Sequence, residues 1–315
     1  MDIALCFDNN FFMQAGATIK SICLSNREEN IVFHLFTNNI TDYNKEILNG
    51  LLITTKQLIR FYNIDESILT GWPVVSRYPK SIYYRFFITQ AIPSSVKYIL
   101  YLDCDIIVRG SLKELFEIDL NNNIIAAVYD KMPFEIDTIN RLSLPIENGY
   151  FNSGVLLIDV QQWRTKDITS KLRDLILKNS KELIYPDQDA LNILFNGNWK
   201  QLHLKYNFQQ GFIYKHTKLY WQNFNELYEA QSNPIIIHFS GIKPWRQECN
   251  NPYKQVWFDV IKHTPWKDFK PIKRNVFYRL FLEIKYFLFY NIHVPDIRHP
   301  FSEKCNYNKL TNPFK

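Results

Sequence analysis

Near the start of the chain, apolar and polar residues come in blocks that have the lengths of strands and helices. Apolar runs of strand length occupy Ile3–Phe7, Ile31–Phe36 and Leu58–Tyr62. The stretches between them, residues 11–25 and Thr41–Leu52, have helical character, and Thr41 is a favourable N-cap residue. Strands and helices alternating at this spacing predict an α/β fold, with a mostly parallel sheet and helices on both faces.

Three more apolar runs predict buried strands in the middle of the chain, at Tyr98–Leu102, Ile124–Val128 and Val155–Ile158. A helix is expected over Asp167–Asn179. Near residue 270 the pattern changes to a basic, aromatic segment. The sequence therefore predicts two parts, a domain over residues 1–270 and a tail over residues 271–315.

The composition is that of a folded protein, since 46% of the residues are hydrophobic and 22% are charged. Five cysteines are scattered without CxxC spacing, so neither a disulfide framework nor a zinc knuckle is expected. The N-terminus carries Asp2 and enters an apolar run at once, unlike a secretory signal. These features predict a reducing, cytoplasmic location.

The net charge of +6 belongs to the tail, because residues 270–315 hold nine Lys or Arg and three Asp or Glu. A nucleic-acid enzyme spreads basic residues around its groove, so no nucleic-acid partner is expected. Residues 274–292 are compatible with an amphipathic helix, and their longest uncharged run, Tyr286–Val294, is too short to span a bilayer. We expect residues 271–315 to lie on an anionic membrane surface; a helix packed on the core is the alternative.

Two acidic residues directly follow the apolar run that ends at Leu102. Asp103 and Asp105 stand at i and i+2 on an extended chain, so their carboxylates project to one side and Cys104 points the other way. In open α/β sheets, ligands gather at the carboxyl ends of strands. A divalent cation would relieve the repulsion between two close carboxylates, although a solvated, helix-capping pair explains the residues equally well.

The segment LYLDCDIIVRGSL at residues 100–112 resembles the metal-binding segment of glycosyltransferase family 8. This family comprises retaining enzymes of the Rossmann-like GT-A fold and includes bacterial lipopolysaccharide galactosyl- and glucosyltransferases. The resemblance runs from Asp2 to about Pro271, and further matching blocks follow in the same order: MDIALCFDNN at the start, Tyr83–Arg85, Asp130, Tyr150–Val155, Pro186–Asn192 and His238–Trp245. Several blocks in one order make the resemblance specific.

The resemblance implies a metal site formed by Asp103, Asp105 and His238, which would hold a cation against the diphosphate of a UDP-sugar. A shell of carboxylate oxygens and an imidazole suits Mn²⁺ better than Mg²⁺, which remains the alternative. Without the resemblance, His238 would be interpreted as a core histidine beside the strand that precedes it.

The resemblance also implies which residues bind the nucleotide. Lys243 and Gly241 stand where family members approach the diphosphate with a lysine and with bare backbone, and Arg85 matches an arginine near the donor. The resemblance places three further positions near the uracil, at Asp8, Asn10 and Phe11. It also includes Cys104, between the two acids, among the donor-binding residues. The alternatives are surface cations for Lys243 and Arg85 and a core aromatic for Phe11.

At the sugar end, Asn152, Asp187, Gln188 and Asp189 match family positions that surround the donor hexose, galactose or glucose. Retention of configuration normally suggests a carboxylate nucleophile. The family instead places Gln188 on that face, and an amide is a poor nucleophile, so electrostatic stabilisation and same-face attack are favoured. Asp130 and Asp189 remain alternative nucleophiles, and an ordinary acidic helix start remains the alternative for the whole block.

The predicted function is a retaining hexosyltransferase that uses UDP-galactose or UDP-glucose. Its expected acceptor is a lipid-linked saccharide, the core of lipopolysaccharide or lipooligosaccharide, at the inner face of the plasma membrane. Acceptor-side candidates lie in the segments 131–149 and 209–229 and include Phe134, Tyr214, Tyr220 and Trp221. The alternatives are a glycogenin-like or protein-directed glycosyltransferase, and a catalytically silent protein that binds sugar nucleotides or acts as a membrane scaffold.

Overall fold

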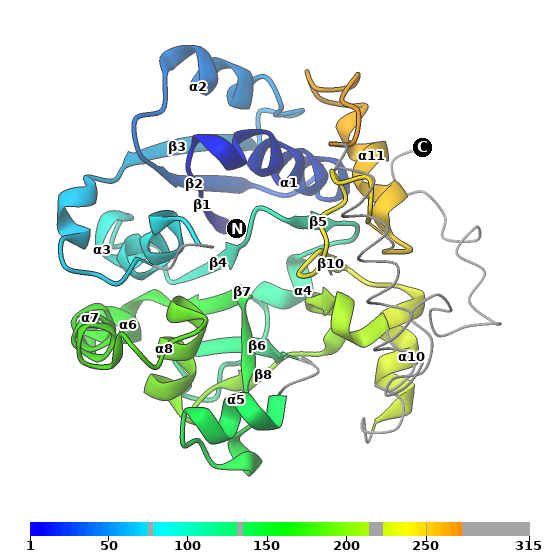
Figure 1. Cartoon of the computed structure of the whole chain (residues 1–315). Coiled ribbons are helices and arrows are strands. Elements are labelled where there is room, and N and C mark those ends of the chain that lie inside the picture. The colour runs from blue at the N-terminus through cyan, green and yellow to red at the C-terminus, as the bar shows by residue number, and fades with distance from the viewer. Residues whose placement is uncertain (75–77, 131–134, 214–222, 250, 273–315) are drawn as a thin grey trace.

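The computed structural model describes residues 1–74, 78–130, 135–213, 223–249 and 251–272. Within them, seven strands form a sheet in the order β3-β2-β1-β4-β7-β6-β8 (Figure 1). The strands are β1 (Asp2–Cys6), β2 (Ile31–Thr37), β3 (Gln57–Asn63), β4 (Tyr98–Leu102), β6 (Ile125–Tyr129), β7 (Phe151–Asp159) and β8 (Lys200–Gln201). All pairs are parallel except those of β7, which runs antiparallel to β4 and β6. The predicted α/β fold with a mostly parallel sheet is confirmed.

A second, smaller sheet has the order β5-β10-β9 within the described residues. Its strands are β5 (Ile106–Val108), β9 (Phe208–Gln209) and β10 (Ile236–His238). β10 runs antiparallel to β5 with His238 opposite Ile106. Because only residues 103–105 separate β4 from β5, this register places His238 beside the acidic pair.

Helices pack against both faces of the large sheet (Figure 1). One face is covered by α1 (Phe12–Ser25), α2 (Asp42–Asn49), α4 (Lys113–Phe116), α10 (Phe224–Ser232) and α11 (Lys254–Ile261). The other is covered by the 3₁₀ helix η3 (Lys80–Phe87) and by α3 (Ile88–Ala91), α6 (Val160–Thr165), α7 (Ile168–Asn179) and α8 (Pro186–Phe195). The remaining helical elements are η1 (Asn9–Phe11), η2 (Glu66–Leu69), α5 (Glu135–Arg141), η4 (Ile146–Asn148), η5 (Leu204–Tyr206) and η6 (Gln210–Ile213).

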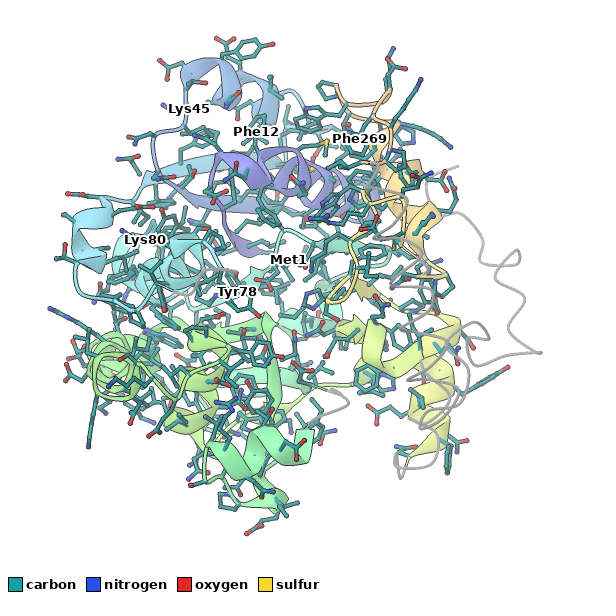
Figure 2. All side chains as sticks on the ribbon, in the orientation of Figure 1. Met1, Phe12, Lys45, Tyr78, Lys80 and Phe269 are labelled. Atoms are coloured by element: carbon teal, nitrogen blue, oxygen red, sulfur yellow. The ribbon has the colours of Figure 1, made fainter. Side chains whose placement is uncertain are left out.

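The two faces of the sheet produce two hydrophobic cores. In β1, Ile3 and Leu5 pack on the α1 side, and Ala4 packs on the η3 side. Figure 2 shows Phe12 of α1 and Phe269, just beyond α11, on the first of these sides. Since neighbouring residues of a strand face opposite sides and both sides are buried, the central strands are continuously apolar, as the sequence pattern indicates.

The carboxyl ends of the parallel strands β1 and β4 lie at one edge of the sheet. The antiparallel strand β7 begins at the same edge, where Asp103 N donates to Gly154 O over 2.9 Å. The pairing of β6 with β7 shifts between Ala126 and Val128. A bulge of this kind redirects side chains, and three residues at its β7 end, Asn152, Ser153 and Gly154, contribute to the candidate active site.

The predicted strands are observed to within a few residues, and the segment around Tyr83–Arg85 forms the 3₁₀ helix η3. Beyond Ile272, the tail lies outside the described residues, and so do Phe134, Tyr214, Tyr220 and Trp221. In the part of the chain that the structure describes, no helix has the length and apolar character needed to cross a membrane.

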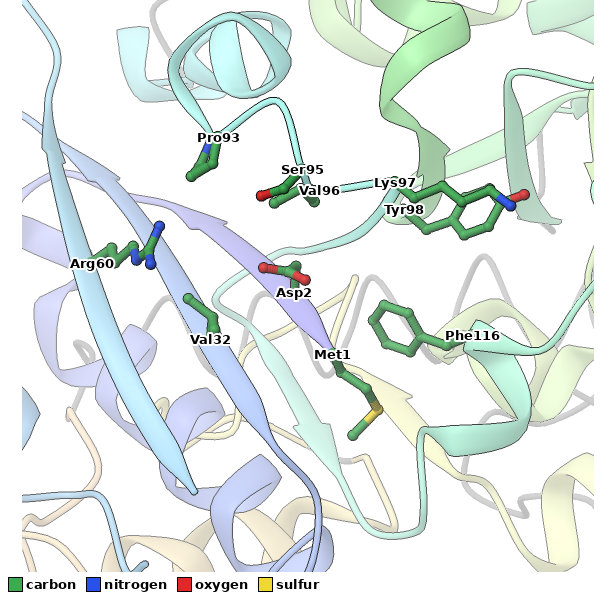
Figure 3. Close-up of a pocket in the computed structure, with 10 residues that line it drawn as sticks. All are labelled: Met1, Asp2, Val32, Arg60, Pro93, Ser95, Val96, Lys97, Tyr98 and Phe116. Atoms are coloured by element: carbon green, nitrogen blue, oxygen red, sulfur yellow. The ribbon is translucent and has the colours of Figure 1, made fainter. Parts of the chain in front are cut away.

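At the opposite edge, a pocket opens among the amino ends of the strands (Figure 3). Asp2 of β1, Arg60 of β3, Tyr98 of β4 and Phe116 of α4 are among the residues that line it. It is therefore separate from the edge where β4 ends in the acidic pair.

Candidate active site

Three side chains with metal-binding atoms converge where β4 and β10 end. Asp103, Asp105 and His238 each offer one such atom, and these atoms lie within 4.8 Å of one another. His238 Nε2 is 3.2 Å from Asp105 Oδ1 and 3.9 Å from Asp103 Oδ2. Two carboxylate oxygens and one imidazole nitrogen form a donor set that fits a divalent cation such as Mn²⁺.

The second oxygen of each carboxylate is held by other side chains. Asp103 Oδ1 accepts from Arg85 Nη2 at 3.0 Å and from the Tyr101 hydroxyl at 2.5 Å. Asp105 Oδ2 forms an ion pair with Lys243 Nζ, which also donates to a backbone carbonyl, Phe239 O, over 2.8 Å. Such outer contacts orient metal ligands, so they leave Asp103 Oδ2 and Asp105 Oδ1 facing His238.

Gly154 leaves the space that this cluster needs. A Cβ atom at residue 154 would lie 2.5 Å from His238 Cε1 and 2.8 Å from Asp103 Oδ2. Both distances are shorter than ordinary van der Waals contact, so any side chain would displace the histidine or the carboxylate. Glycine at residue 154 therefore allows His238 and Asp103 to take the positions in which they could bind a cation together.

Each carboxylate of the metal-binding cluster lies beside a cation, Arg85 or Lys243. Burial by itself would raise the pKa of Asp105, but Lys243 and His238 outweigh it and hold that pKa below its ordinary value. Burial would likewise lower the pKa of Arg85, yet Asp187 and Asp103 raise it above its ordinary value. Arg85 is thus a permanent cation between two carboxylates, at 2.9 Å from Asp187 Oδ2 and 3.0 Å from Asp103 Oδ1.

Cys104 turns away from the two acids, as the i, i+2 alternation predicts. Its thiol is buried and donates to Cys6 O over 3.6 Å. Burial raises the pKa of the Cys104 thiol well above its ordinary value, so the group is a neutral, inert part of the core. Any contact of residue 104 with a sugar-nucleotide donor would therefore involve its backbone atoms.

On the β7 side of the cluster, the residues predicted to face the sugar form one hydrogen-bonded group. Gln188 Oε1 accepts from Ser153 N at 2.9 Å and from Asn152 Nδ2 at 3.3 Å, and Gln188 Nε2 donates to Asp130 Oδ2 over 2.7 Å. Asn152 Nδ2 also donates to Asp130 Oδ2 over 3.1 Å. The structure thus brings Asn152, Gln188 and Asp130 together and fixes both ends of the Gln188 amide.

Asp187 joins this group to the metal-binding cluster through Arg85. Burial raises the pKa of Asp187 above its ordinary value, against the opposing effect of Arg85. Ser153 Oγ also donates to Asp187 Oδ2 over 3.3 Å. Asp187 and Gln188, in the first turn of α8, therefore both contact Ser153 near the start of β7.

Asp189 has different surroundings from its neighbours. It is fully buried and accepts from the Tyr150 hydroxyl at 2.6 Å, from Ile184 N at 2.8 Å and from Tyr185 N at 3.0 Å. Arg141 Nη1 forms an ion pair with its Oδ2 at 3.1 Å. This arrangement is that of a structural carboxylate at a helix start, so the contacts favour Asp130 and Gln188 over Asp189 for chemistry.

The residues predicted to bind the nucleotide lie at the end of β1 and after β10. Asp8 caps η1 by accepting from Asn10 N at 2.9 Å, and the side chain of Asn10 is exposed. The ring of Phe11 packs edge-on against Trp245, with centroids 6.3 Å apart. At Gly241, a Cβ would collide with the side chain of Gln210. Their contacts with uracil and phosphate stay predictions.

Four residues that contribute to the site were assigned no individual function from the sequence: Tyr101, Ser153 and Gly154, which lie within matching segments, and Asn207, which does not. Tyr101 could have been found, because it precedes Asp103 by two positions on the same face of β4. Asn207 had no local signal. Its Oδ1 lies 3.0 Å from His238 Nδ1, a contact that depends on the pairing of β9 with β10.

This site, at the edge of a GT-A-like sheet, agrees with a family comparison. The model of the glycosyl transferase family 8 matches residues 2–249, and the chain therefore belongs to glycosyltransferase family 8.

Among individual relatives, the chain is 31% identical to a lipopolysaccharide 1,2-glucosyltransferase of Escherichia coli, over 85% of this chain and 80% of the relative. It is 30% identical to general stress protein A of Bacillus subtilis, over 84% of this chain and 94% of that protein. The structure is similar to that of the galactosyltransferase LgtC in complex with donor and acceptor sugar analogues, with a TM-score of 0.74 and 25% identity over 84% of this chain and 96% of LgtC.

Proposed function

We propose that this glycosyltransferase is a retaining hexosyltransferase that moves galactose or glucose from a UDP-sugar to a saccharide acceptor. The observation that carries the proposal is the cluster of Asp103, Asp105 and His238, with Lys243 on one side and the Gln188 group on the other. A cation-binding centre with an adjacent lysine suits a diphosphate, and amides suit the hydroxyls of a hexose.

A Mn²⁺ ion held by Asp103, Asp105 and His238 would act as a Lewis acid on the diphosphate. The Lys243 ammonium adds positive charge on the same side, and Arg85 holds the carboxylates of Asp103 and Asp187 in place through its two ion pairs. In the transfer, the bond between the anomeric carbon and the phosphate oxygen breaks, and a bond to an acceptor hydroxyl oxygen forms. The departing UDP takes up the proton of that hydroxyl.

Retention by same-face attack is supported by the surroundings of Gln188. Its amide is held at both ends, by Ser153 N and by Asp130, so its carbonyl dipole has a defined direction. An amide dipole that is fixed beside the sugar would stabilise the positive charge that develops there electrostatically, without forming a bond to it.

For the acceptor, we propose the core of lipopolysaccharide or lipooligosaccharide. Relatives named as lipopolysaccharide glucosyl- and galactosyltransferases support this choice, including a lipopolysaccharide 1,3-galactosyltransferase of Salmonella typhimurium that is 28% identical over 84% of this chain. A lipid-linked acceptor also agrees with the basic segment 271–315, which we propose to bind the anionic inner face of the plasma membrane.

The test is the release of UDP from UDP-galactose and UDP-glucose, with Mn²⁺ and with a chelator. We expect slow, Mn²⁺-dependent hydrolysis of one donor by the wild type and none by Asp105→Asn. An Asp174→Asn variant, which removes the same charge from an exposed position of α7, should match the wild type. Absence of both turnover and Mn²⁺-dependent UDP binding in the wild type would refute the proposal.

A further inference from the structure

Asn207 lies directly behind the histidine of the metal-binding cluster. It precedes β9, whose residue Gln209 pairs with His238 in the small sheet. Its side chain is completely buried, and each of its two amide atoms contacts another polar side chain. Oδ1 lies 3.0 Å from His238 Nδ1, and Nδ2 donates to Asn152 Oδ1 over 2.9 Å.

The orientations of these amides follow from a main-chain donor. Gly154 N lies 3.0 Å from the Asn152 side chain, and a backbone N–H can only donate. The Asn152 atom that faces Gly154 must therefore be its oxygen. The same oxygen faces Asn207, which must present its NH₂ group there and its carbonyl oxygen to His238.

An amide oxygen at this position determines which nitrogen of His238 carries hydrogen. Because Asn207 Oδ1 can only accept, His238 Nδ1 must donate. The neutral ring then has its lone pair on Nε2, the atom that faces Asp105 Oδ1 at 3.2 Å and Asp103 Oδ2 at 3.9 Å. Metal-binding histidines use this arrangement, in which the distal N–H is held by an acceptor.

We propose that Asn207 is a positioning residue that holds His238 in its Nδ1–H tautomer and so presents Nε2 to the cation. The inference rests on the proposed function, since it presumes a metal at Asp103, Asp105 and His238. Asn207 also links the two halves of the candidate site. It bonds Asn152, which donates to Gln188 and Asp130, and it contacts His238 of the metal-binding cluster.

The decisive experiment compares Asn207→Leu with Asn207→Asp in Mn²⁺ titrations followed by electron paramagnetic resonance, without donor. Leucine removes the acceptor, so we expect Mn²⁺ to bind about tenfold to hundredfold more weakly. Aspartate can still accept from Nδ1–H, so its Mn²⁺ affinity should remain nearer to that of the wild type. A purely structural role predicts the reverse order, because a buried aspartate would face Asn152 Oδ1.

Asn26→Leu serves as the matched control. Asn26 is also buried, and its side-chain oxygen accepts a hydrogen bond from Leu112 N at 2.8 Å. It makes no contact with Asp103, Asp105 or His238 among the described hydrogen bonds. We expect its Mn²⁺ affinity to equal that of the wild type, with folding of every variant checked by urea unfolding. Equal affinities of wild type and Asn207→Leu, or weaker binding by Asn207→Asp than by Asn207→Leu, would overturn the role of Asn207 alone. A wild-type protein that binds no Mn²⁺ would instead remove the metal site and the proposed function with it.

A second measurement does not depend on a folded variant. Nitrogen NMR of the wild-type histidine rings at about pH 8, above the usual histidine pKa, reports the tautomer of each ring. The His238 signal is identified by its loss in His238→Gln. The Nδ1–H tautomer is expected, and a predominant Nε2–H tautomer would refute the inference.

Discussion

At the scale of single residues, the candidate metal site depends on which atom of each side chain faces inward. One oxygen of Asp103 is held by Arg85 and Tyr101, so the other faces His238. Gly154 completes the arrangement because it has no Cβ to occupy the gap. The geometry therefore rests on contacts of about hydrogen-bond length, which a single methyl group can disturb.

Gly154→Ala tests this dependence. Its new Cβ would overlap His238 and Asp103, so we expect weaker Mn²⁺ binding and a free energy of unfolding lower by about 1–3 kcal/mol. Gly50→Ala is the control, since Gly50 has a right-handed helical conformation and a Cβ there would have ordinary contacts. Its stability should be unchanged or higher by up to about 1 kcal/mol. Urea unfolding and Mn²⁺ titration measure both effects, and wild-type Mn²⁺ affinity in Gly154→Ala would contradict the prediction.

The raised pKa of Asp187 predicts a pH dependence of stability. Burial raises this pKa in the folded state, so protonated Asp187 favours folding relative to the ionised group. That contribution is complete below the unfolded pKa of about 3.9 and disappears as pH rises through the folded pKa. Asp187→Asn lacks it, so the unfolding free energy of the wild type, minus that of the variant, should fall as pH rises from about 3 to 6. Parallel curves from urea unfolding across this range would show that the folded pKa is not raised.

At the scale of elements, α8 presents three consecutive polar residues to different surroundings. Asp187 pairs with Arg85, Gln188 bonds to β7, and Asp189 is buried against Tyr150 and Arg141. The last contact joins α5 to the start of α8. Asp189 thus fixes the position of α8. The two residues before it in the same helix, Asp187 and Gln188, face the candidate donor site.

Asp189→Asn should lower the free energy of unfolding by about 3 kcal/mol, because it breaks a buried ion pair and leaves Arg141 unbalanced. Urea unfolding measures the loss. The exposed Asp174→Asn should change stability by no more than about 0.5 kcal/mol. If Asp189→Asn abolished transfer while its stability stayed at the wild-type value, the residue would act in the chemistry instead.

At the scale of the whole molecule, charge and chemistry occupy different parts of the chain. Residues 1–269 have no net charge, and the whole excess of +6 lies in residues 270–315. The last described residue, Ile272, forms a bridge with Arg246, just after Trp245. The basic segment therefore begins close in space to the block that contains Lys243. A tail starting there would bring a bound membrane near the site.

Replacing Lys273, Arg274, Arg279 and Lys285 by Gln in the chain of residues 1–315 should greatly weaken its binding to vesicles that contain anionic lipid. Each cation near such a surface contributes about 1 kcal/mol. Vesicle flotation measures binding, with neutral vesicles as the reference. Replacing Lys166, Lys171, Lys178 and Lys181, exposed on or near α6 and α7, changes the charge equally and should leave binding intact. Equal loss in both variants would indicate a general charge effect and refute docking by the tail.

The amino-acid sequence by itself determined the order of the main strands of the large sheet and of several helices, and the place of the acidic pair. Both follow from local rules, because periodicity shows which faces are buried and a parallel sheet presents ligands at its carboxyl edge. The matching blocks at Tyr150–Val155, Pro186–Asn192 and His238–Trp245 also indicated which distant segments belong to one site. Their residues do meet, since Gln188 bonds Ser153 and His238 lies beside Asp105.

Only the tertiary structure decided what each of these residues does there. Asp187, Gln188 and Asp189 are adjacent in sequence but have different surroundings. Asp187 pairs with Arg85 beside the metal-binding cluster, Gln188 bonds the amide of Asn152, and Asp189 is buried in the interior. The need for glycine at residue 154 and the contact of Asn207 with His238 were likewise invisible, because both depend on the register of strands far apart in the chain. Sequence patterns specify which side of an element is buried, but hydrogen bonds between elements depend on how those elements pack.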